Sequence, residues 1–242
     1  MRLAVISDIH GNMDALEQVL ADIDRLGVET VYSLGDNIGY GAEPERVVQT
    51  LMRRGIPSVL GNHEMAALDP GFLDWFNPVA QESLTRTFAM LSPGSMRYAA
   101  GRPTQMSAYG CRFVHGFPPD SPTVYLFQVE AERRGRVLSA LPQRLCFVGH
   151  THCMEIVGWD GSRFSDVDIG EGPIPIEPHL KYLINIGSVG QPRDGDPRAR
   201  YALWDRAHST LEIRFVAYDV HAAADKILAA GLPEPHARRL LG

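Results

Sequence analysis

The chain has 242 residues, a length that fits one large α/β domain with a small insertion. Hydrophobic residues make up 45% of the sequence and charged residues 21%, which excludes a disordered or collagen-like chain. The formal net charge is −6, so we do not expect an extended nucleic-acid surface, which requires a basic face.

No apolar stretch is long enough to cross a bilayer, and the first predicted strand begins at Leu3, which leaves no room for a signal peptide. The three cysteines, Cys111, Cys146 and Cys153, are an odd number without the spacing of a disulfide framework. A reducing compartment explains them better than disulfides do. We therefore expect a cytoplasmic protein that is not bound to a membrane.

The first part of the chain alternates short apolar runs with segments of helical periodicity. This alternation favours a mostly parallel sheet that is covered by helices on both faces. The pattern predicts helices at 16–26, ended by Gly27, and from Pro44 to Gly55, and strands at 3–6, 31–34, 58–60, 112–114 and 145–148.

Residues 69–110 are less regular, and we interpret them as a helical and hairpin insertion within a single domain that spans residues 1–242. Its predicted elements are a helix that carries Ala80, Leu84, Phe88 and Leu91, followed by strands at 97–100 and 106–109.

The second half has short strands separated by turn-rich loops, which suggests a second sheet. A Pro-rich acidic stretch at 165–179 is predicted to be a long loop, and 219–230 a closing helix ended by Gly231. The predicted strands lie near 155–157, 182–186, 202–205 and 211–216.

Polar side chains that can bind metal ions follow the predicted strands. In α/β sheets the carboxyl ends of strands meet at one edge, so residues distant in sequence can converge there. The candidates are Asp8, His10, Asp36, Asn62, His63, His115, His150 and His152. Five of the nine histidines belong to this set, and the other four, His179, His208, His221 and His236, lie in loops or the last helix.

Carboxylate, amide and imidazole ligands together suit Mn, Fe, Co or Zn better than Ca, and paired cysteine ligands are absent from the sequence. The number of ligands fits two divalent or trivalent ions, and we favour Mn or Fe. A bridging Asp36 could hold both ions at roughly 3.5 to 4 Å, the separation that two-metal hydrolases use.

These blocks resemble the pattern of the calcineurin-like metallophosphoesterase superfamily, which is Asp-x-His, Gly-Asp, Gly-Asn-His-Asp/Glu, His, and Gly-His-x-His. All five blocks occur in order between Asp8 and His152. A later run from Asn185 to Arg193 resembles the small bacterial phosphodiesterase-like branch of the superfamily. Each block alone is a weak signal, whereas five in order are specific.

The resemblance implies a four-layer αββα sandwich with a dinuclear metal site at the carboxyl ends of the strands. It also implies that a metal-bridging hydroxide attacks phosphorus while Asn62 and the ions stabilise the transition state, and that His63 stabilises or protonates the leaving oxygen. The implied ligands are Asp8, His10, Asp36 and His152 for one ion and Asp36, Asn62, His115 and His150 for the other.

The expected substrate is a small phosphodiester or a dinucleoside polyphosphate, with a nucleotide as one option. Phosphoprotein phosphatases of the superfamily continue Gly-Asp with Asp-Arg-Gly, whereas Asp36 here is followed by Asn37, Ile38 and Gly39, which disfavours that activity. A phosphomonoesterase and a non-catalytic binding scaffold remain alternatives, although His63 argues against the scaffold. The sequence leaves the formation of an oligomer open.

Several residues near the motifs have a structural explanation beside a functional one. Asn12 is better explained as a helix N-cap than as support for the metal site, and Glu64 as a helix-starting or supporting residue than as a ligand. Cys153 is expected to be a packed thiol, because neighbours in an extended segment point apart.

Two further features bear on the substrate. Trp75 and Phe76 can form a wall for an aromatic ring, although such pairs more often pack a core. Arg193 is the better candidate for substrate binding, because a guanidinium can hold phosphate in a bidentate manner, and a solvated turn is the equally weighted alternative.

Overall fold

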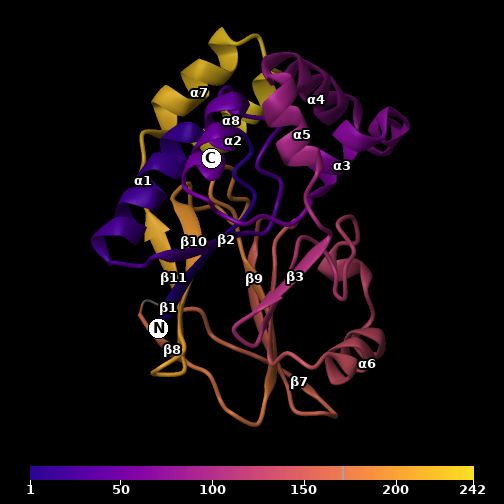
Figure 1. Ribbon diagram of the computed structural model, residues 1–242, viewed down its shortest axis with the longest axis vertical. Coiled ribbons are helices and arrows are strands. Elements are labelled where there is room, and N and C mark those ends of the chain that lie inside the picture. The colour runs from indigo at the N-terminus through magenta and orange to yellow at the C-terminus, as the bar shows by residue number, and fades with distance from the viewer. Residues whose placement is uncertain (171) are drawn as a thin grey trace.

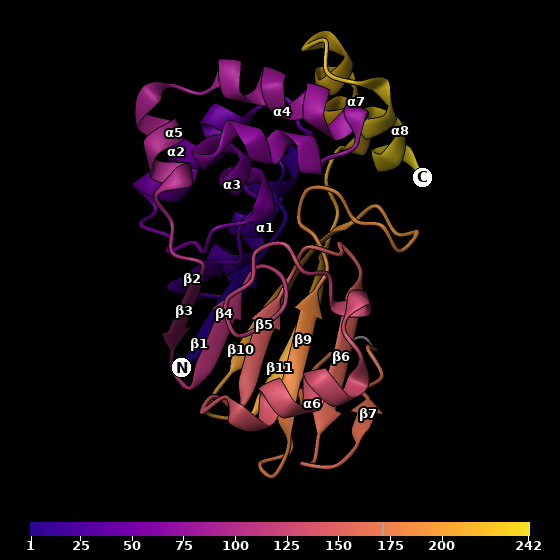
Figure 2. The same ribbon diagram turned by 90° about the vertical axis from the view of Figure 1, so that its right-hand side faces the viewer.

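The computed structural model describes residues 1–170 and 172–242, and it contains two mixed β-sheets that pack face to face with helices on both outer faces (Figures 1 and 2). The predicted four-layer arrangement is therefore confirmed. The first sheet has the order β2-β1-β10-β11-β8, formed by Thr30–Ser33, Arg2–Ile6, Ala199–Asp205, Thr210–Val216 and Ile174–Pro175. The second has the order β3-β4-β5-β9-β6-β7, formed by Gln105–Ala108, Cys111–Val114, Leu145–Val148, Lys181–Ile186, Met154–Trp159 and Phe164–Asp166.

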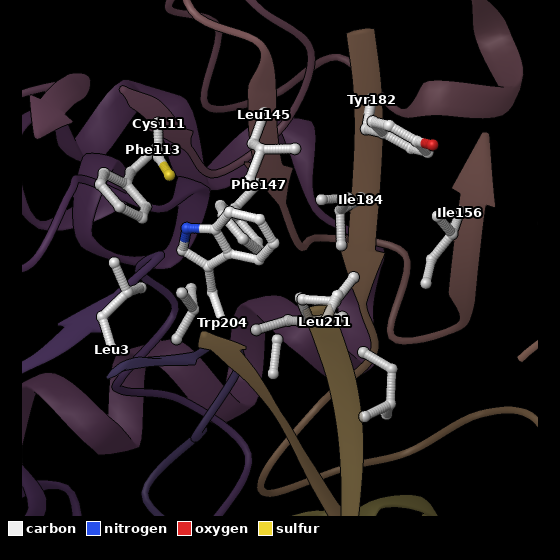
Figure 3. Close-up of a cluster of buried hydrophobic side chains, with 14 of the residues drawn as sticks. Leu3, Cys111, Phe113, Leu145, Phe147, Ile156, Tyr182, Ile184, Trp204 and Leu211 are labelled. Atoms are coloured by element: carbon white, nitrogen blue, oxygen red, sulfur yellow. The ribbon is translucent and has the colours of Figure 1, made fainter. Parts of the chain in front are cut away.

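Strand β1 shows how the sequence builds the layers. Successive side chains of a strand point to opposite faces, so Leu3 and Val5 enter the core between the sheets while Ala4 and Ile6 face the helices. The central core also receives Trp204 from β10, and Figure 3 shows it lying between the two sheets. Both faces of β1 are apolar because both are covered.

Three helices form the outer layers. Helices α1 (Met13–Arg25) and α2 (Pro44–Arg53) cover the first sheet, with Leu16, Val19 and Leu51 in its outer core. Helix α6 (Ala131–Ala140) covers the second sheet through Leu138, which packs in one cluster with Cys146. The sequence reading missed α6, whose apolar positions are few.

The remaining helices gather at one end of the sandwich, toward which β5 and β9 point (Figure 2). They are α3 (Asn62–Leu68), α4 (Pro78–Met90), α5 (Pro93–Ala100), α7 (Val220–Ala229) and α8 (Glu234–Leu241), with short 3-10 helices at Pro70–Trp75 and Leu126–Gln128. Throughout the described residues, no helix combines the length and the hydropathy required to span a membrane.

Two predicted strands are wrong. Residues 97–100 belong to α5, because Ser92 caps that helix by accepting a hydrogen bond from Ser95 and Pro93 stands at its first position. Residues 58–60 make only a single bridge, between Ser58 and Ser33, before the chain enters α3.

The division of the chain between sheets also differs from the expectation. The strands predicted at 202–205 and 211–216 join β1 in the first sheet instead of completing a second-half sheet. The predicted loop at 165–179 contains the end of β7 and all of β8, while residue 171 lies outside the described residues. Sheet membership depends on long-range pairing, which the local pattern of residues does not encode.

Candidate metal centre

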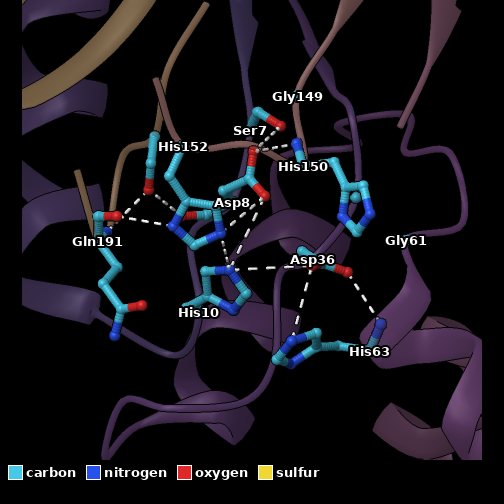
Figure 4. A network of polar contacts seen from close by, with 12 residues as sticks. Ser7, Asp8, His10, Asp36, Gly61, His63, Gly149, His150, His152 and Gln191 are labelled. Atoms are coloured by element: carbon cyan, nitrogen blue, oxygen red, sulfur yellow. Dashed lines mark hydrogen bonds and ion pairs between the residues drawn. The ribbon is translucent and has the colours of Figure 1, made fainter. Parts of the chain in front are cut away.

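The side chains singled out by the sequence motifs converge where the loops after the strands meet, and Figure 4 shows Asp8, His10, Asp36, His63, His150 and His152 close together. They come from the loops after β1, β2, β4 and β5 and from the first turn of α3. All of these side chains are buried, with at most 3% of any residue exposed: Asp8, His10, Asp36, Asn62, His63, His115, His150 and His152. A polar cluster this large is costly to bury unless its groups are paired or bind ions.

One group within the cluster contains Asp8, His10 and His152. The Nε2 atoms of the two histidines lie 3.0 Å apart, and Oδ1 of Asp8 is 3.4 Å from Nε2 of His152. Oδ2 of Asp8 instead accepts hydrogen bonds from Ser7 Oγ at 2.6 Å and from the backbone N–H of His150 at 3.1 Å. Asp8 is thereby oriented with its other oxygen facing the histidines.

A second group contains Asp36, His115 and His150, with Asn62 beside them. His115 Nε2 lies 3.1 Å from His150 Nδ1 and 3.0 Å from Asn62 Oδ1. Oδ2 of Asp36 is 3.3 Å from His115 Nε2 and 3.8 Å from His10 Nε2. The carboxylate of Asp36 therefore lies between the two groups.

The histidine rings are oriented by backbone carbonyl groups on their far sides. The bonds join His10 Nδ1 to Ile38 O (3.1 Å), His152 Nδ1 to Gln191 O (2.7 Å), His115 Nδ1 to Leu34 O (2.9 Å) and His150 Nε2 to Thr123 O (3.1 Å). Carbonyls only accept, so these nitrogens carry the N–H groups, and in each ring that is neutral the remaining nitrogen directs a lone pair into the site.

This arrangement fits bound cations. Lone pairs of His10 and His152 face each other at 3.0 Å, and Oδ1 of Asp8 is buried without a hydrogen-bond partner among the residues that the structure describes. Opposed lone pairs and an unpaired buried carboxylate oxygen are unfavourable without a positive charge between them. A histidine that donates its second N–H to a carbonyl is the usual arrangement around a protein-bound metal.

Burial lowers the pKa values of the histidines in the site, whereas the nearby carboxylates raise them. Burial lowers the pKa of His10 and His152 well below the usual range and that of His150 to about 3, so these rings stay neutral. Burial also disfavours the charged form of His115, but Asp36 outweighs it and raises the pKa of His115 to about 9. The carboxylate that attracts this proton would equally attract a cation.

The backbone at the site is strained. Five residues of the cluster have left-handed backbone conformations, with φ of 53° for Asp8, 50° for His10, 50° for Asp36, 70° for His150 and 61° for His152. Such conformations cost about 1 to 3 kcal/mol each and persist where the surroundings impose them. Strain concentrated on these residues is typical of a functional site.

Glu64 holds part of this backbone in place. Its carboxylate accepts hydrogen bonds from the backbone N–H groups of Asp36 at 2.9 Å, Asn37 at 2.7 Å and Gly61 at 3.1 Å. It also stands at the third position of α3, so the structure agrees with the helix-starting and supporting interpretation. Burial raises the pKa of Glu64 to about 7, and Asp36 adds to this shift.

Two glycines allow loops to approach each other. A Cβ atom at Gly61 would lie 2.1 Å from Oδ1 of Asp36, and one at Gly149 would lie 2.0 Å from Oγ of Ser7. Any side chain at these positions would push apart the loops that carry the cluster.

The loop after β9 connects the two halves of the site. Ser188 donates a hydrogen bond to the backbone oxygen of Asp8 at 2.8 Å, and Nδ2 of Asn12 donates to Gly190 O at 2.9 Å. Oδ1 of Asn12 accepts from Ala15 N at 3.0 Å, which confirms its predicted role as the cap of α1. This loop is thus a scaffold as well as the carrier of Arg193.

A cleft of about 480 Å³ opens beside the cluster. The predicted residues His63, Trp75, Phe76 and Arg193 line it, and the ring of His63 contacts Phe76 at a centroid distance of 5.2 Å. Cys153 is half-buried and is not part of any group of possible ligands formed by the described residues.

The sequence reading missed other residues of the cleft, namely Tyr125, His236 and Arg239. Tyr125 stacks on the ring of His150 with centroids 3.7 Å apart, and His236 comes from α8, a helix that the sequence analysis did not predict. No local pattern marks these residues, because they reach the cleft through the packing of α8 and of the segment before Leu126 against the site.

Comparison with known proteins agrees with this geometry. The profile of the calcineurin-like phosphoesterase superfamily domain matches residues 1–209. An uncharacterized protein of Methanocaldococcus jannaschii is 34% identical over 243 residues, covering 98% of this chain and 96% of the relative.

A solved structure and a shorter match add detail. The crystal structure of a metallophosphoesterase from Sphaerobacter thermophilus is 34% identical, covers 100% of this chain and 99% of its own, and superimposes with a TM-score of 0.85. A symmetrical bis(5'-nucleosyl)-tetraphosphatase of Delftia acidovorans is 38% identical over 71 residues, which are 28% of this chain and 25% of the relative.

Proposed function

The chain belongs to the calcineurin-like phosphoesterase superfamily, and from this premise we propose that it is a hydrolase with a dinuclear metal centre, acting on a small phosphodiester or a dinucleoside polyphosphate. The observation that carries the proposal is the pair of opposed histidine lone-pair sites on either side of Asp36. The adjoining cleft supplies room for a small substrate.

We assign the two ions to the two groups of side chains. The ligands would be Asp8, His10, Asp36 and His152 for one ion and Asp36, Asn62, His115 and His150 for the other. Divalent ions bound there would act as Lewis acids toward phosphoryl oxygens and lower the pKa of water. The donor set suits Mn, Fe, Co or Zn, of which Mn and Fe are favoured.

His63 is the proposed partner of the leaving oxygen. It lines the cleft and its Nε2 lies 3.8 Å from Oδ2 of Asp36, so it borders both the ligand cluster and the substrate space. Burial lowers the pKa of His63 to about 4, which keeps the ring neutral at pH 7. A neutral ring can donate one N–H hydrogen bond to the leaving oxygen and thereby stabilise its developing charge.

Arg193 is the proposed contact for substrate phosphate. Its Nη2 donates a hydrogen bond to Gln191 Oε1 at 3.2 Å, and its side chain also hydrogen-bonds Tyr40, while its buried Nε has no partner among the described residues. A buried donor without a partner is unfavourable, and a phosphoryl oxygen in the cleft would satisfy it.

The aromatic side of the cleft supports a substrate with a ring. Trp75 is 45% exposed, and its ring lies parallel to that of Tyr125 with centroids 6.4 Å apart. Trp75 lies in the segment 69–110, which we propose to be an insertion in a single domain that adapts the common site to a particular substrate. The relative from Delftia acidovorans, named for a dinucleoside tetraphosphate, is consistent with such a substrate.

The proposal is tested with protein reconstituted with Mn and assayed on bis-p-nitrophenyl phosphate, p-nitrophenyl phosphate and diadenosine tetraphosphate. We expect turnover of the diester or the tetraphosphate. His63→Ala should retain its metal and lose a factor of about 10² to 10⁴ in kcat. The exposed histidine His208 provides the matched control, since His208→Ala should leave kcat unchanged.

Full metal loading without turnover of any of the three compounds would contradict the hydrolase and favour a binding scaffold. Preferential turnover of p-nitrophenyl phosphate would instead identify a phosphomonoesterase. An unchanged kcat in His63→Ala would show that His63 takes no part in the reaction.

A further inference from the structure

The C-terminal helix α8 forms one wall of the substrate cleft, although it lies beyond residue 209, where the match to the family profile ends. Pro235, His236 and Arg239 of this helix line the cleft. Figure 2 shows α7 and α8 at the same end of the molecule as α3 and α4. The family motifs therefore do not account for this side of the site.

His236 fixes the position of the helix relative to the metal ligands. Its ring is 4% exposed and packs on Tyr40 with centroids 4.4 Å apart. Tyr40 in turn contacts the rings of His10 and His63, both with centroids 4.5 Å apart from its own. A chain of packed rings thus holds α8, and Arg239 one turn later, against the catalytic cluster.

Arg239 and Arg193 form a pair of positive charges without a carboxylate partner. Other arginines nearby are neutralised, Arg238 by Glu234 and Arg200 by Asp194. Across residues 1–170 and 172–242, neither Arg193 nor Arg239 forms an ion pair with a carboxylate. Partial burial lowers the pKa of Arg239, and the charge of Arg193 lowers it further.

The two arginines also join two cavities. Arg193, Pro235 and Arg239 line both the cleft at the metal centre and an adjoining cavity of about 550 Å³. A ligand that extends from the metal centre into this second cavity therefore passes along both arginines. Asp196 also lines the second cavity but is paired with Arg198, so the two guanidinium groups favour an anion on this path, and a phosphoryl group matches their planar hydrogen-bond donors.

We propose that Arg239 and Arg193 bind a second phosphoryl group of the substrate, next to the one that reacts at the metal centre. This inference rests on the proposed function and narrows its substrate class to esters and anhydrides that carry at least two linked phosphoryl groups. Arg239 is then a specificity-determining residue supplied by α8.

The test compares the binding of two probes to the Mn-loaded protein by titration calorimetry. The probes are α,β-methylene ADP, whose two phosphoryl groups are joined by a non-hydrolysable bridge, and AMP, which has one. We expect Arg239→Ala to weaken the binding of the first probe about tenfold or more, as for the loss of a charged hydrogen bond, and that of AMP less than about threefold. Arg239→Glu should weaken the binding of α,β-methylene ADP further.

Arg136→Ala is the matched control, because it removes the same charge from helix α6 at an exposed residue that is paired with Glu132 and lines neither cavity. It should change neither affinity by more than about twofold. Equal losses for both probes in Arg239→Ala, or an equal loss in Arg136→Ala, would overturn the proposal. Circular dichroism checks that the variants keep their fold, which is expected because Arg239 is exposed.

Turnover of bis-p-nitrophenyl phosphate, p-nitrophenyl phosphate and diadenosine tetraphosphate, measured on the same samples, separates this proposal from the proposed function. If none of the three compounds is turned over while Arg239→Ala still discriminates between the probes, the hydrolase is wrong and the second phosphoryl site stands. If turnover is present and discrimination is absent, the hydrolase stands and the second site is wrong.

Discussion

Replacing Asp36 by Asn removes the negative charge between the two groups of ligands, and we expect it to weaken the binding of both metal ions. The new amide oxygen can still accept the hydrogen bond that Oδ1 of Asp36 takes from the backbone N–H of His63 at 2.9 Å. The amide NH₂ then occupies the place of Oδ2 and carries hydrogens where a cation requires a lone pair.

The size of the effect follows from the distances around Oδ2. This atom lies 3.3 Å from Nε2 of His115 and 3.8 Å from Nε2 of His10, so cations held by these nitrogens share its charge. A pair of unit charges about 4 Å apart contributes about 4 kcal/mol at an effective dielectric constant near 20, or roughly a thousandfold in affinity. Because side chains can rearrange, we expect each ion to bind about 10² to 10³ times more weakly.

Metal content after dialysis, measured by plasma mass spectrometry, and calorimetric titration with Mn together check this prediction. Asp160→Asn is the control, because it makes the same chemical change at a fully exposed turn far from the cluster. Circular dichroism establishes that both variants are folded. Two tightly bound ions in Asp36→Asn would refute the position of Asp36 between the metals.

Three further changes test the substrate wall, the loop packing and the coupling of metal to stability. Trp75→Ala should weaken diadenosine tetraphosphate binding by about 1 to 3 kcal/mol through lost stacking, seen as a raised KM, whereas Tyr109→Ala on the exposed β3–β4 hairpin should not. Gly149→Ala should lower the free energy of unfolding in urea by about 1 to 3 kcal/mol, because the added Cβ clashes with Ser7. Gly94→Ala is the control and should not lower it, because the Cβ added there has a single neighbouring atom, at 3.9 Å. Removal of metal by a chelator should lower the melting temperature, since ions at a hundredfold excess over Kd stabilise a folded protein by about 3 kcal/mol per site; an unchanged melting temperature would contradict cation binding in the buried cluster.

Local sequence signals identified most of the secondary structure. The helix α1 was readable because Leu16 and Val19 recur at helical spacing and Asn12 caps the first turn. The short strand β5 was readable as an apolar run that is covered on both faces. Residues 97–100 are helical instead of extended because Ser92 and Pro93 start α5 just before them, and this helix-start signal outweighs the short apolar run.

The assignment of strands to sheets could not be read in the same way. Strand β10 pairs with β1, about two hundred residues earlier in the chain, and its Trp204 fills the core between the sheets. Its sequence is compatible with either sheet, because both sheets have apolar inner faces. Only the packing of the complete chain selects the partner.

The sequence by itself predicted a metal site, because residues such as Asp8, Asp36 and His150 follow strands whose carboxyl ends meet at one edge, and the structure brings these residues together. The tertiary structure decided which nitrogen of each histidine faces the site, because the carbonyl groups that orient the rings come from distant loops. It also decided the wall of the cleft, where α8 places Arg239 in the same cleft as Trp75 and Phe76. No local pattern marks such a residue, because its role arises from the docking of one helix against a site built elsewhere in the chain.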